Sequence, residues 1–285
     1  MLNKLTITYS SGVTDDVTSS SAITSFPMAV SIEGVNLGAT PKNFIFYMYQ
    51  YKIVKNSGGP PTTSKTNVML APCNESDWSS YGTQFTSQFS AFGFGQMLCI
   101  QNGQNISLAG YAGSDTYEYL SLEIVQCNQT LDATCDTPSN INTYMNNYVA
   151  ANDYFKVKLY VVDSIITPTN EDAVSRVLEK DIFLAFSRTV GTVGSINMAE
   201  FELLTDTSLF PINSYDSTTG IYIADFSTNA VSLSTTRYIH LNVYRSTKYM
   251  SITRTIGKLD TVLSYVGGLF SLLFTGIAFF FGSYS

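Results

Sequence analysis

The chain has 285 residues, enough for one large or two modest domains with a proper core, which excludes a small scaffold held together only by disulfides. Hydrophobic residues make up 45% of the chain and charged residues only 13%, a composition that excludes a disordered or fibrous protein. The formal net charge of −7 gives no electrostatic basis for binding a polyanion, so we expect no nucleic acid partner.

The chain opens on a polar lead-in without periodicity, 10–25, and a Gly/Pro/Ser/Thr-rich stretch, 56–66, is interpreted as a loop. Segments rich in β-branched and aromatic residues predict strands at 43–54, 117–126, 155–162, 182–186, 199–204, 221–226 and 238–244. Apolar residues alternate with polar ones in several of them, the pattern of a sheet with one wet face. The fold class predicted is mainly β, an antiparallel sheet or sandwich with one or two helices, followed by a C-terminal transmembrane helix.

Four cysteines lie within a 63-residue stretch: Cys73, Cys99, Cys127 and Cys135. An even, clustered number favours two disulfides, and among the three possible connectivities the spacing favours Cys127 with Cys135 and Cys73 with Cys99. The alternative is a zinc site, which the sequence supports poorly because no pair has C-x-x-C spacing and the single histidine lies far from the cluster.

Three N-x-[ST] sequons occur in the same region, at Asn74, Asn105 and Asn128. Their number alone is what chance gives in a chain this rich in Asn, Ser and Thr, so only their position beside the cysteines supports glycosylation. We therefore place residues 1–255 in an extracytoplasmic compartment, as one β-rich ectodomain.

One helix is predicted in this domain, 140–152, with Ser139 as the cap of its first turn. Its apolar residues recur at i, i+3, i+4, i+7 and i+8, beginning at Ile141. Such an amphipathic helix is expected to pack on the sheet.

No residue combination predicts catalysis. The only histidine, His240, lies in a strand pattern and is interpreted as an ordinary sheet residue, and the carboxylate pairs Glu118/Glu123 and Glu200/Glu202 as solvated side chains. The motifs of phosphoryl transfer, zinc hydrolysis, serine hydrolases and Ca²⁺ loops are absent from the sequence. We predict a protein that is not an enzyme and holds neither a metal nor a cofactor.

Five bases and no acid lie between Asp225 and Asp260, namely Arg237, Arg245, Lys248, Arg254 and Lys258. By the positive-inside tendency these bases would place the amino-terminal side in the cytoplasm, and residues 1–30 contain no apolar signal sequence. A tail-anchored cytosolic protein would fit both facts but not the cysteines. We expect instead that a signal or membrane helix precedes this chain in a longer protein, with the basic strip at the outer headgroups or against an acidic partner.

The last segment, 256–285, is predicted to be a juxtamembrane stretch and a membrane span. Residues 261–285 contain no charged side chain, and 262–282 would form a helix long enough to cross a hydrocarbon core of roughly 30 Å. The alternative, a buried core helix, rarely carries so long a run without a charge. We expect the lipid bilayer as a partner.

Small residues lie along one face of this helix when successive residues are placed about 100° apart. They are Ser264, Gly267, Ser271, Thr275, Ala278 and Gly282. Such a seam lets helix backbones approach one another in lipid, so it predicts association with other transmembrane subunits or a homo-oligomer. The alternatives are that small residues are simply common in spans, or that Gly267-Gly268 forms a kink.

The run from Arg254 to Asp260, followed by VLSYVGGLFSLLF, resembles the closing segment of a family of ciliate transmembrane proteins. Cys73 with Asp77 and Trp78, then Leu98-Cys99, then Cys127 and Cys135 before a helix, are also similar to that family. The resemblance extends from about residue 26 onward. It implies a luminal domain preceded by a further membrane helix, and no particular activity.

The function predicted is a non-enzymatic, membrane-anchored surface or lumenal glycoprotein subunit that assembles through its ectodomain and its helix seam. We expect it in the plasma or ciliary membrane, or in an endomembrane. The alternative is a subunit of a two-helix oligomeric ion channel with a β-rich ectodomain, in which Gly267-Gly268 with Ser271 and Thr275 would line a pore or form its gating joint. A lumenal trafficking receptor would have the same layout.

Overall fold

The computed structural model describes residues 4–10, 23–24, 27–40, 42–77, 89, 91–101, 103–166, 174–206, 208, 214–233, 236–255 and 259–282. Of these, only the backbone is described for 4–10, 165–166, 175–181, 255, 259–262 and 278–282. Most of the polar lead-in, 10–25, therefore lies outside the described residues.

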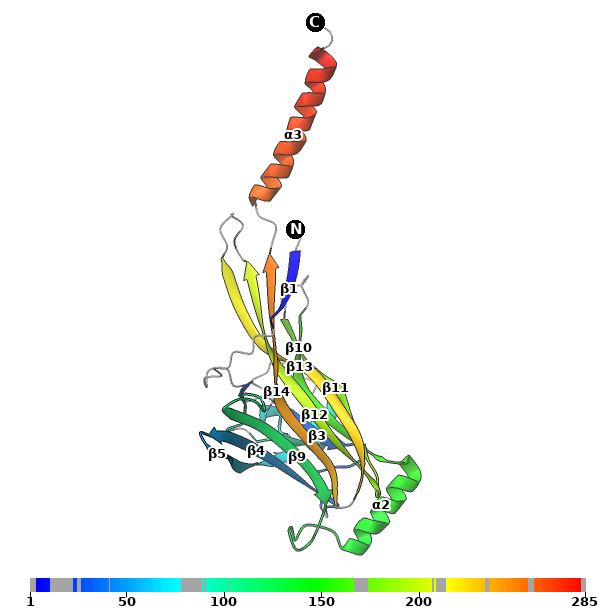
Figure 1. The fold of residues 1–285 in the computed structure, drawn as a ribbon. Helices are drawn as coiled ribbons and strands as arrows, with labels where there is room; N and C mark the ends of the chain where they lie inside the picture. Colours follow the sequence, from blue (N-terminus) through cyan, green and yellow to red (C-terminus); the bar gives the residue numbers. More distant parts are fainter. Residues whose placement is uncertain are drawn as a thin grey trace.

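Two sheets make up the body of the molecule (Figure 1). The larger has seven strands, in the order β13 (Tyr215–Ser232), β12 (Val190–Asp206), β14 (Arg237–Thr255), β9 (Thr116–Gln126), β4 (Phe44–Asn56) and β5 (Gly59–Val68), with β1 (Lys4–Ser10) also paired to β14. The smaller has the order β11 (Val174–Phe186), β10 (Phe155–Ile166), β3 (Met28–Ile32), β7 (Leu98–Ile100) and β6 (Leu70–Pro72). A third, two-stranded sheet joins β2 (Ile23–Thr24) to β8 (Ser107–Leu108), and short 3₁₀ turns lie at η2 (Glu75–Asp77) and η4 (Phe94–Gln96).

Every strand pairing among these elements is antiparallel except that of β12 with β14, so the prediction of a mainly antiparallel β fold is confirmed. All seven predicted strands are present, most of them longer than the sequence pattern indicated. β13 runs antiparallel to β12 and so brings the chain back to the end of the sheet at which β12 begins. β14 therefore runs in the same direction as β12, and it pairs with the edge of β12 opposite β13.

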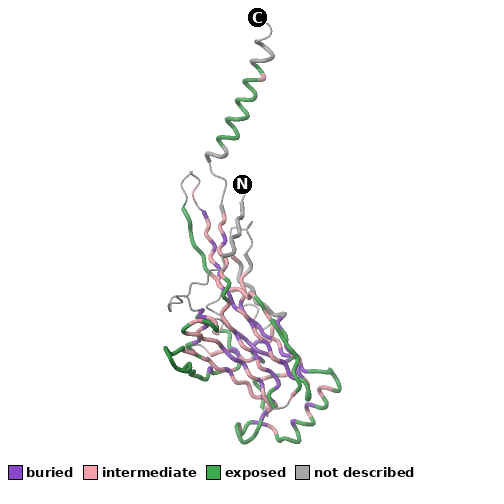
Figure 2. The backbone as a smooth tube through the Cα atoms, viewed as in Figure 1, coloured by how far each residue is buried: buried purple, intermediate pink, exposed green. Residues whose placement is uncertain are grey.

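The main core is a cluster of buried apolar side chains that come from strands of both sheets. Figure 2 marks the buried positions along these strands in purple. Leu120, Leu122 and Leu159 are each fully buried in this core. The alternation read from the sequence is confirmed on β10, where Lys156 and Lys158 point the other way and lie near the Glu33 carboxylate. Burial of these apolar faces is the main force holding the sheets together.

The stretch 56–66 is a hairpin and a strand, so its interpretation as a loop was wrong. Asn56 pairs with Gly59 across a two-residue turn, and Gly58 has a φ of 82°, which a residue without a Cβ adopts freely. The chain then continues as β5 despite Pro60 and Pro61. Both prolines are tolerated because β5 is an edge strand and they lie at an irregularity of its register with β4, between the pairs Val54–Thr62 and Asn56–Gly59.

The predicted helix is present as α2 (Pro138–Asn152), with a different cap. Thr137 accepts a hydrogen bond from the Asn140 backbone N–H and Pro138 occupies the first turn, so Ser139 was the wrong capping residue. Ile141 and Met145 are buried under the helix, as the spacing predicted.

Aromatic rings hold α2 against the end of the sandwich. Tyr148 stacks on Phe155 of β10 with ring centroids 4.0 Å apart, and Phe155 stacks in turn on Phe186 of β11 at 4.9 Å. The Tyr148 hydroxyl also donates a hydrogen bond to the Glu33 carbonyl oxygen. Stacked pairs of this kind add stability beyond the area they bury, so α2 is a fixed part of the domain.

The far end of the larger sheet forms a stalk, in which 249–255 of β14 pair with β1 on one side and with 200–205 of β12 on the other. Its inner face has a small core of its own, built on Phe201, Leu203 and Ile252. Lys4 pairs with Thr255, so β1 begins beside the residue after which the chain leads into α3 (Leu259–Gly282). The first and last described segments therefore lie at the same pole, opposite α2 (Figure 1).

The C-terminal helix α3 extends away from the sheets (Figure 1). Its side chains from Leu263 to Ile277 are exposed, apart from a partly covered Gly276. Within the described part of the chain, no helical stretch meets both the length and the hydropathy that crossing a membrane requires. β14 ends at Thr255 and α3 begins at Leu259, and the division into an ectodomain at 1–255 and a membrane segment at 256–285 stays a prediction.

Candidate functional site

Both favoured disulfides are present in the structure. Cys73 at the end of β6 is bonded to Cys99 in β7, with the two Cα atoms 4.8 Å apart, and Cys127 after β9 is bonded to Cys135, at 5.5 Å. All four sulfurs are thereby used and every cysteine is buried, so the alternative of a zinc site at these cysteines is excluded. No group of three or more potential metal ligands occurs in the described part of the chain.

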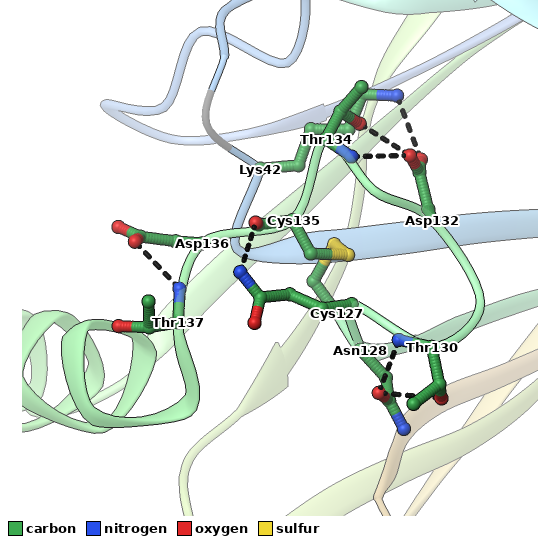
Figure 3. Close-up of a disulfide and its surroundings, with 10 residues drawn as sticks. Lys42, Cys127, Asn128, Thr130, Asp132, Thr134, Cys135, Asp136 and Thr137 are labelled. Carbon is green, nitrogen blue, oxygen red and sulfur yellow. Dashed lines mark hydrogen bonds and ion pairs between the residues drawn. A yellow bond between two sulfur atoms is a disulfide. The ribbon is translucent and has the colours of Figure 1, made fainter.

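The loop closed by Cys127 and Cys135 is ordered by its own polar side chains (Figure 3). Asn128 accepts hydrogen bonds from the backbone N–H and the hydroxyl of Thr130, and Asp132 accepts the same pair of bonds from Thr134. These are local turns that fix the backbone without help from a sheet.

Lys42 ties this loop to the start of β4 (Figure 3). Its Nζ atom lies 3.2 Å from Oδ2 of Asp132, while its backbone N–H donates to the Thr134 carbonyl and its carbonyl accepts from the Asp136 N–H. The hydrogen bonds from Thr134, and then the ammonium of Lys42, hold the pKa of Asp132 at about 2. Asp132 therefore stays ionised and the pair carries no net charge over the ordinary pH range.

A cavity of about 410 Å³ lies beside this ion pair. Its wall comes from four places: the segment between β3 and β4, the first residues of β4, the edge formed by β6 and β7, and Asp132 of the Cys127–Cys135 loop. The apolar part includes Val35, Leu37, Ile45, Phe46, Leu70 and Leu98, and the polar part includes Asn36, Lys42, Asn43 and Asp132. The volume is within the range of small-molecule sites in proteins.

One polar residue of the wall, Asn43, has an unsatisfied hydrogen-bond acceptor. Its Oδ1 atom is buried and has no hydrogen-bond partner among the described residues. By contrast, Asn36 Oδ1 accepts a hydrogen bond from the Gly38 N–H at 3.0 Å. The sequence analysis did not identify this cavity, because its wall combines segments up to about a hundred residues apart and carries no motif.

The three sequon asparagines are all exposed, on loops or at the start of short elements. Asn74 and Asn128 directly follow the disulfide cysteines Cys73 and Cys127, and Asn105 precedes β8. Exposure is required for a glycan, so the structure permits modification at each of them, and glycosylation stays a prediction.

His240 lies on the outward face of the larger sheet, with its Nε2 atom 3.1 Å from the hydroxyl of Ser121 on β9. Burial, and then the guanidinium of Arg237, lowers its pKa below the ordinary value. A hydrogen bond to a serine on the neighbouring strand matches the interpretation as a sheet histidine.

Each carboxylate of the pairs considered in the sequence analysis is bonded to another side chain in the structure. Glu200 and Glu202 do share one face of β12, where Glu200 pairs with Arg245 at 2.6 Å and Glu202 accepts hydrogen bonds from Tyr249 and Ser217. Burial and the hydrogen bond to Glu202 raise the pKa of Tyr249 to about 12. These contacts make the pairs structural links between strands of the stalk.

Glu118 and Glu123 lie apart on β9 and each has a cation of its own. Glu118 pairs with Lys52 of β4 at 2.8 Å, and Glu123 pairs with Arg237 of β14 at 3.0 Å. The two carboxylates therefore do not form a joint site.

The basic residues of β14 are spread along the length of this strand and do not form one cluster. Arg237 and Arg245 are neutralised by acids on neighbouring strands, and Arg237 lies at the end of β14 remote from α3. The expectation that all five bases face one acidic surface or headgroup layer was therefore wrong, because an extended strand separates its ends by about 3.3 Å per residue.

Six tyrosines contact one another on the outward face of the larger sheet. The sequence analysis did not identify this group, because aromatic residues occur throughout the chain. The group comprises Tyr47, Tyr49, Tyr51, Tyr117, Tyr119 and Tyr244. Tyr51 and Tyr119 are nearly parallel, with centroids 5.0 Å apart, and the Lys65 ammonium lies 3.4 Å from the Tyr49 ring centre. Mutual burial raises the pKa of Tyr117 and Tyr119, and the rings are used in contacts with one another.

On α3, a Cβ added at Gly267 or Gly268 would meet no described atom within 4 Å apart from its chain neighbours and the backbone of its own helix. The Thr275 hydroxyl donates to the carbonyl of Ser271 one turn earlier, at 2.8 Å, so this seam hydroxyl is satisfied within its own helix. The side chains of Ala278 and Gly282 lie outside the described residues. The seam stays a prediction as a helix contact.

Among the solved structures with a similar backbone, two match most of the chain. One is a proton-activated chloride channel, with 9% identity, a TM-score of 0.29, and 98% of this chain and 82% of that chain covered. The other is Erv41p, with 9% identity, a TM-score of 0.26, and 90% and 99% covered. At these scores neither similarity supports an argument about this chain.

No curated protein sequence matches the chain. None of the comparisons bears on the resemblance to ciliate transmembrane proteins, which stays a prediction. A family model does match residues 29–252, from the beginning of β3 almost to the end of β14. Because the match covers most of the chain, the protein belongs to the family described as the uncharacterised 80 kDa protein N-terminal domain.

Proposed function

We propose that this chain is a non-enzymatic, membrane-anchored glycoprotein subunit, with its β domain in an oxidising compartment and its C-terminal helix in a bilayer beside other helices. The observation that carries the proposal is the exposed apolar surface of α3. Leu272, Phe274 and Tyr265 are 73%, 68% and 78% exposed, as the side chains of α3 from Leu263 to Phe274 generally are.

Exposed apolar surface on α3 favours contact with lipid or with another apolar surface, because each Å² of it removed from water contributes about 25 cal/mol of favourable free energy. The helix has 24 residues and would be about 36 Å long, against roughly 30 Å for a hydrocarbon core. Residues 261–285 have no charged side chain. A lipid bilayer suits a helix whose large exposed side chains are nearly all apolar.

The two disulfides support the compartment in this proposal. Disulfides persist in secretory, lumenal and extracellular spaces and are rare where thiols are kept reduced. The exposed sequon asparagines suit the same compartment. We accordingly propose the plasma or ciliary membrane, or an endomembrane, with the β domain on the extracellular or lumenal side.

The assembly part of the proposal rests on the seam. The seam glycines let another backbone approach closely, and lipid offers no hydrophobic force that would compete with such close packing. We propose no enzymatic role because the sequence lacks the catalytic motifs named above, and because the candidate carboxylates are bonded to other side chains.

Topology can be tested in cells that express the full chain behind a cleavable signal sequence. The proposal expects the protein to resist carbonate extraction, to lose mass on treatment with a glycan-removing amidase, and to lose that sensitivity when Asn74, Asn105 and Asn128 are all changed to Gln. Release by carbonate, or thiols that react with maleimide without prior reduction, would contradict it.

Assembly can be tested by crosslinking in membranes with matched glycine variants. Gly267→Leu places a large side chain on the seam, whereas Gly276→Leu places the same side chain roughly 100° away from the edge of the seam. The proposal expects crosslinked oligomers of the unchanged chain and of the Gly276 variant, and their loss in the Gly267 variant. Equal behaviour of the two variants would remove the seam from the proposal.

The alternative function, a subunit of a two-helix oligomeric ion channel, stays a prediction, because no described contact or charge in α3 favours a conducting path.

A further inference from the structure

We propose that Asn128 accepts a glycan only while its neighbour Cys127 is still a thiol, whereas Asn105 accepts one independently of the disulfides. This selectivity rests on the proposed function, which places the β domain in a compartment that both glycosylates and oxidises proteins. It goes beyond that function because it assigns a different glycan occupancy to each of the three sequons. In the folded protein the occupancy is highest at Asn105, lower at Asn74 and lowest at Asn128.

Glycosylation and disulfide formation compete for the same few residues. In glycosylation, the asparagine Nδ2 forms a bond to C1 of a sugar, the bond from C1 to a lipid diphosphate breaks, and Nδ2 loses one proton. In disulfide formation, two thiols give two electrons and two protons to the disulfide of an oxidoreductase, which leaves as a dithiol. The two reactions use different atoms, so each can block the other only through the shape of the chain.

In the folded chain the sequon at Asn128 is held in a turn (Figure 3). Asn128 Oδ1 accepts hydrogen bonds from the Thr130 hydroxyl at 2.8 Å and from the Thr130 N–H at 3.0 Å. The Asn128 carbonyl accepts from the N–H groups of Leu131 and Asp132 at 2.9 and 3.0 Å. Because every sequon needs a hydroxyl two residues after the asparagine, we infer that the transferring enzyme binds this hydroxyl. In the closed loop it is bonded to the asparagine instead.

The Cys127–Cys135 bridge prevents the turn from opening. Both cysteines are 4% exposed and belong to the main core. The Cys127 N–H donates to the Asn43 carbonyl at 3.0 Å, and Lys42 is bonded to the loop through its N–H, its carbonyl and its ammonium group. An enzyme that holds residues on both sides of Asn128 would have to pull a buried half-cystine out of the core, so the closed loop is not a substrate.

Asn74 is restricted in the same way. It directly follows Cys73, which is buried and bridged to Cys99. In the folded chain the Asn74 N–H donates to Oδ2 of Asp77 at 2.8 Å, and Asn74 Oδ1 accepts a hydrogen bond from the Ser76 N–H at 3.4 Å. This sequon is therefore also held in a turn beside a buried half-cystine.

Asn105 lies between the two disulfide loops and inside neither. Its side chain is exposed and makes no hydrogen bond within the described part of the chain. The residues after it become fixed only when the domain folds, because Ile106 is buried in the main core and Ser107 pairs with β2. That core includes residues of β14, which begins 132 residues after Asn105. Asn105 therefore stays open for longer than the other two sequons.

The order of synthesis sets how long each of the other sequons stays open. Cys135 follows Asn128 by 7 residues, and Cys99 follows Asn74 by 25. At about 5–20 residues per second, these separations correspond to about 0.4–1.4 s and about 1.3–5 s. At equal rates of glycan transfer, the occupancy of Asn128 should therefore be about 3.5 times lower than that of Asn74.

Occupancy can be measured at each sequon in the full chain, expressed in cells behind a cleavable signal sequence. The glycan-removing amidase, used in water labelled with heavy oxygen, converts each glycosylated asparagine to a labelled aspartate, and mass spectrometry of the peptides gives the labelled fraction. Total cell lysate is used, so that chains which fail to fold are counted. We expect the occupancy to fall from Asn105 to Asn74 and then, by about 3.5-fold, to Asn128.

Removal of the small bridge tests the mechanism directly. The variant Cys127→Ala/Cys135→Ala should raise the occupancy of Asn128 by about 3.5-fold or more, because its sequon then stays open at least as long as that of Asn74. The occupancy of Asn74 and Asn105 should not change.

Two controls separate the bridge from the stability of the fold. The matched variant Cys73→Ala/Cys99→Ala should raise the occupancy of Asn74 and leave that of Asn128 unchanged. The variant Leu120→Ala weakens the main core while both bridges remain, so the occupancy of Asn128 should stay low.

The proposal is overturned if Asn128 is occupied as fully as Asn105 in the unchanged chain, if removal of the Cys127–Cys135 bridge leaves the occupancy of Asn128 unchanged, or if Leu120→Ala raises it equally. These outcomes leave the proposed function intact, since a glycan at any sequon still places the β domain in a glycosylating compartment. No glycan at any sequon, in the unchanged chain and in both bridge variants, would instead contradict the compartment itself and the selectivity with it.

Discussion

The two disulfides should differ in what they contribute to stability, and the difference can be worked out from the chain. Cys73 and Cys99 are separated by 26 residues, and Cys127 and Cys135 by 8. In the chain-entropy model, closing these loops in the unfolded state stabilises the fold by about 3.5 and about 2.5 kcal/mol respectively. Removing the first bridge should therefore lower the free energy of unfolding by about 1 kcal/mol more than removing the second.

The comparison is well matched because all four cysteines are buried, so replacement by alanine removes similar contacts. The double variants Cys73→Ala/Cys99→Ala and Cys127→Ala/Cys135→Ala would be prepared as full chains in nanodiscs and unfolded in urea, with circular dichroism as the signal. The linear extrapolation of each curve gives the free energy of unfolding.

The reverse order would refute the reasoning. If loss of the Cys127–Cys135 bridge cost more, the stabilisation would come from the contacts that this loop makes with Lys42 and Asn43 in the folded state, and not from loop closure in the unfolded chain. Equal costs would likewise contradict a contribution that depends on loop length.

Gly220→Ala should destabilise the stalk by about 1–3 kcal/mol, seen as a lower thermal midpoint, because the added methyl would overlap the buried Phe201 ring; an unchanged midpoint would contradict this packing. Asp132 has a lowered pKa, so its stabilising effect is present above pH 4 and disappears as the pH falls towards about 2. Urea midpoints measured from pH 5 to pH 2 should therefore fall more steeply for the unchanged chain than for Asp132→Asn, and parallel curves would argue against the Lys42 contact. Asn43→Leu should raise the free energy of unfolding by about 1 kcal/mol, because it replaces an unsatisfied buried oxygen with a methyl; a urea midpoint lower than that of the unchanged chain would show that the oxygen has a partner.

Strands and the helix could be predicted from the sequence because their signals are local. The alternation around Leu120 and Phe155 depends only on the two-residue period of a strand, and the stripe below α2 only on the period of a helix. β5 was missed for the opposite reason. Its composition, GPPTTSKTNV, is that of a loop, and it becomes a strand only because β4 offers it a free edge.

The disulfide pairing could be favoured from spacing, but the cavity could not. Val35, Ile45 and Leu98 meet there only because β3, β4 and β7 belong to sheets that pack together, and no periodicity in one segment records that meeting. The unpaired state of Asn43 is also a property of the surroundings, since the same residue at another position would face water.

The basic strip shows how sequence proximity can mislead about charge, and it leads to a final prediction. Along β14, Lys248 lies about 23 Å before Thr255, while Arg237 and Arg245 are paired with Glu123 and Glu200. Of the five bases, only Arg254 and Lys258 directly precede α3 in the sequence. At about 1 kcal/mol for each base near an anionic surface, headgroup attraction would add about 2 kcal/mol rather than 5.

Apolar burial of α3 should therefore dominate membrane attachment under the proposed function. The full chain should prefer vesicles with a third of anionic lipid over neutral vesicles by at most about thirtyfold, which is the preference that about 2 kcal/mol from two bases gives. The variant Arg254→Gln/Lys258→Gln should remove what preference there is, whereas Arg237→Gln should not change it. A preference of a thousandfold or more, or one that depends on Arg237, would mean that the whole strip faces the membrane and that the paired state of Arg237 and Arg245 does not persist there.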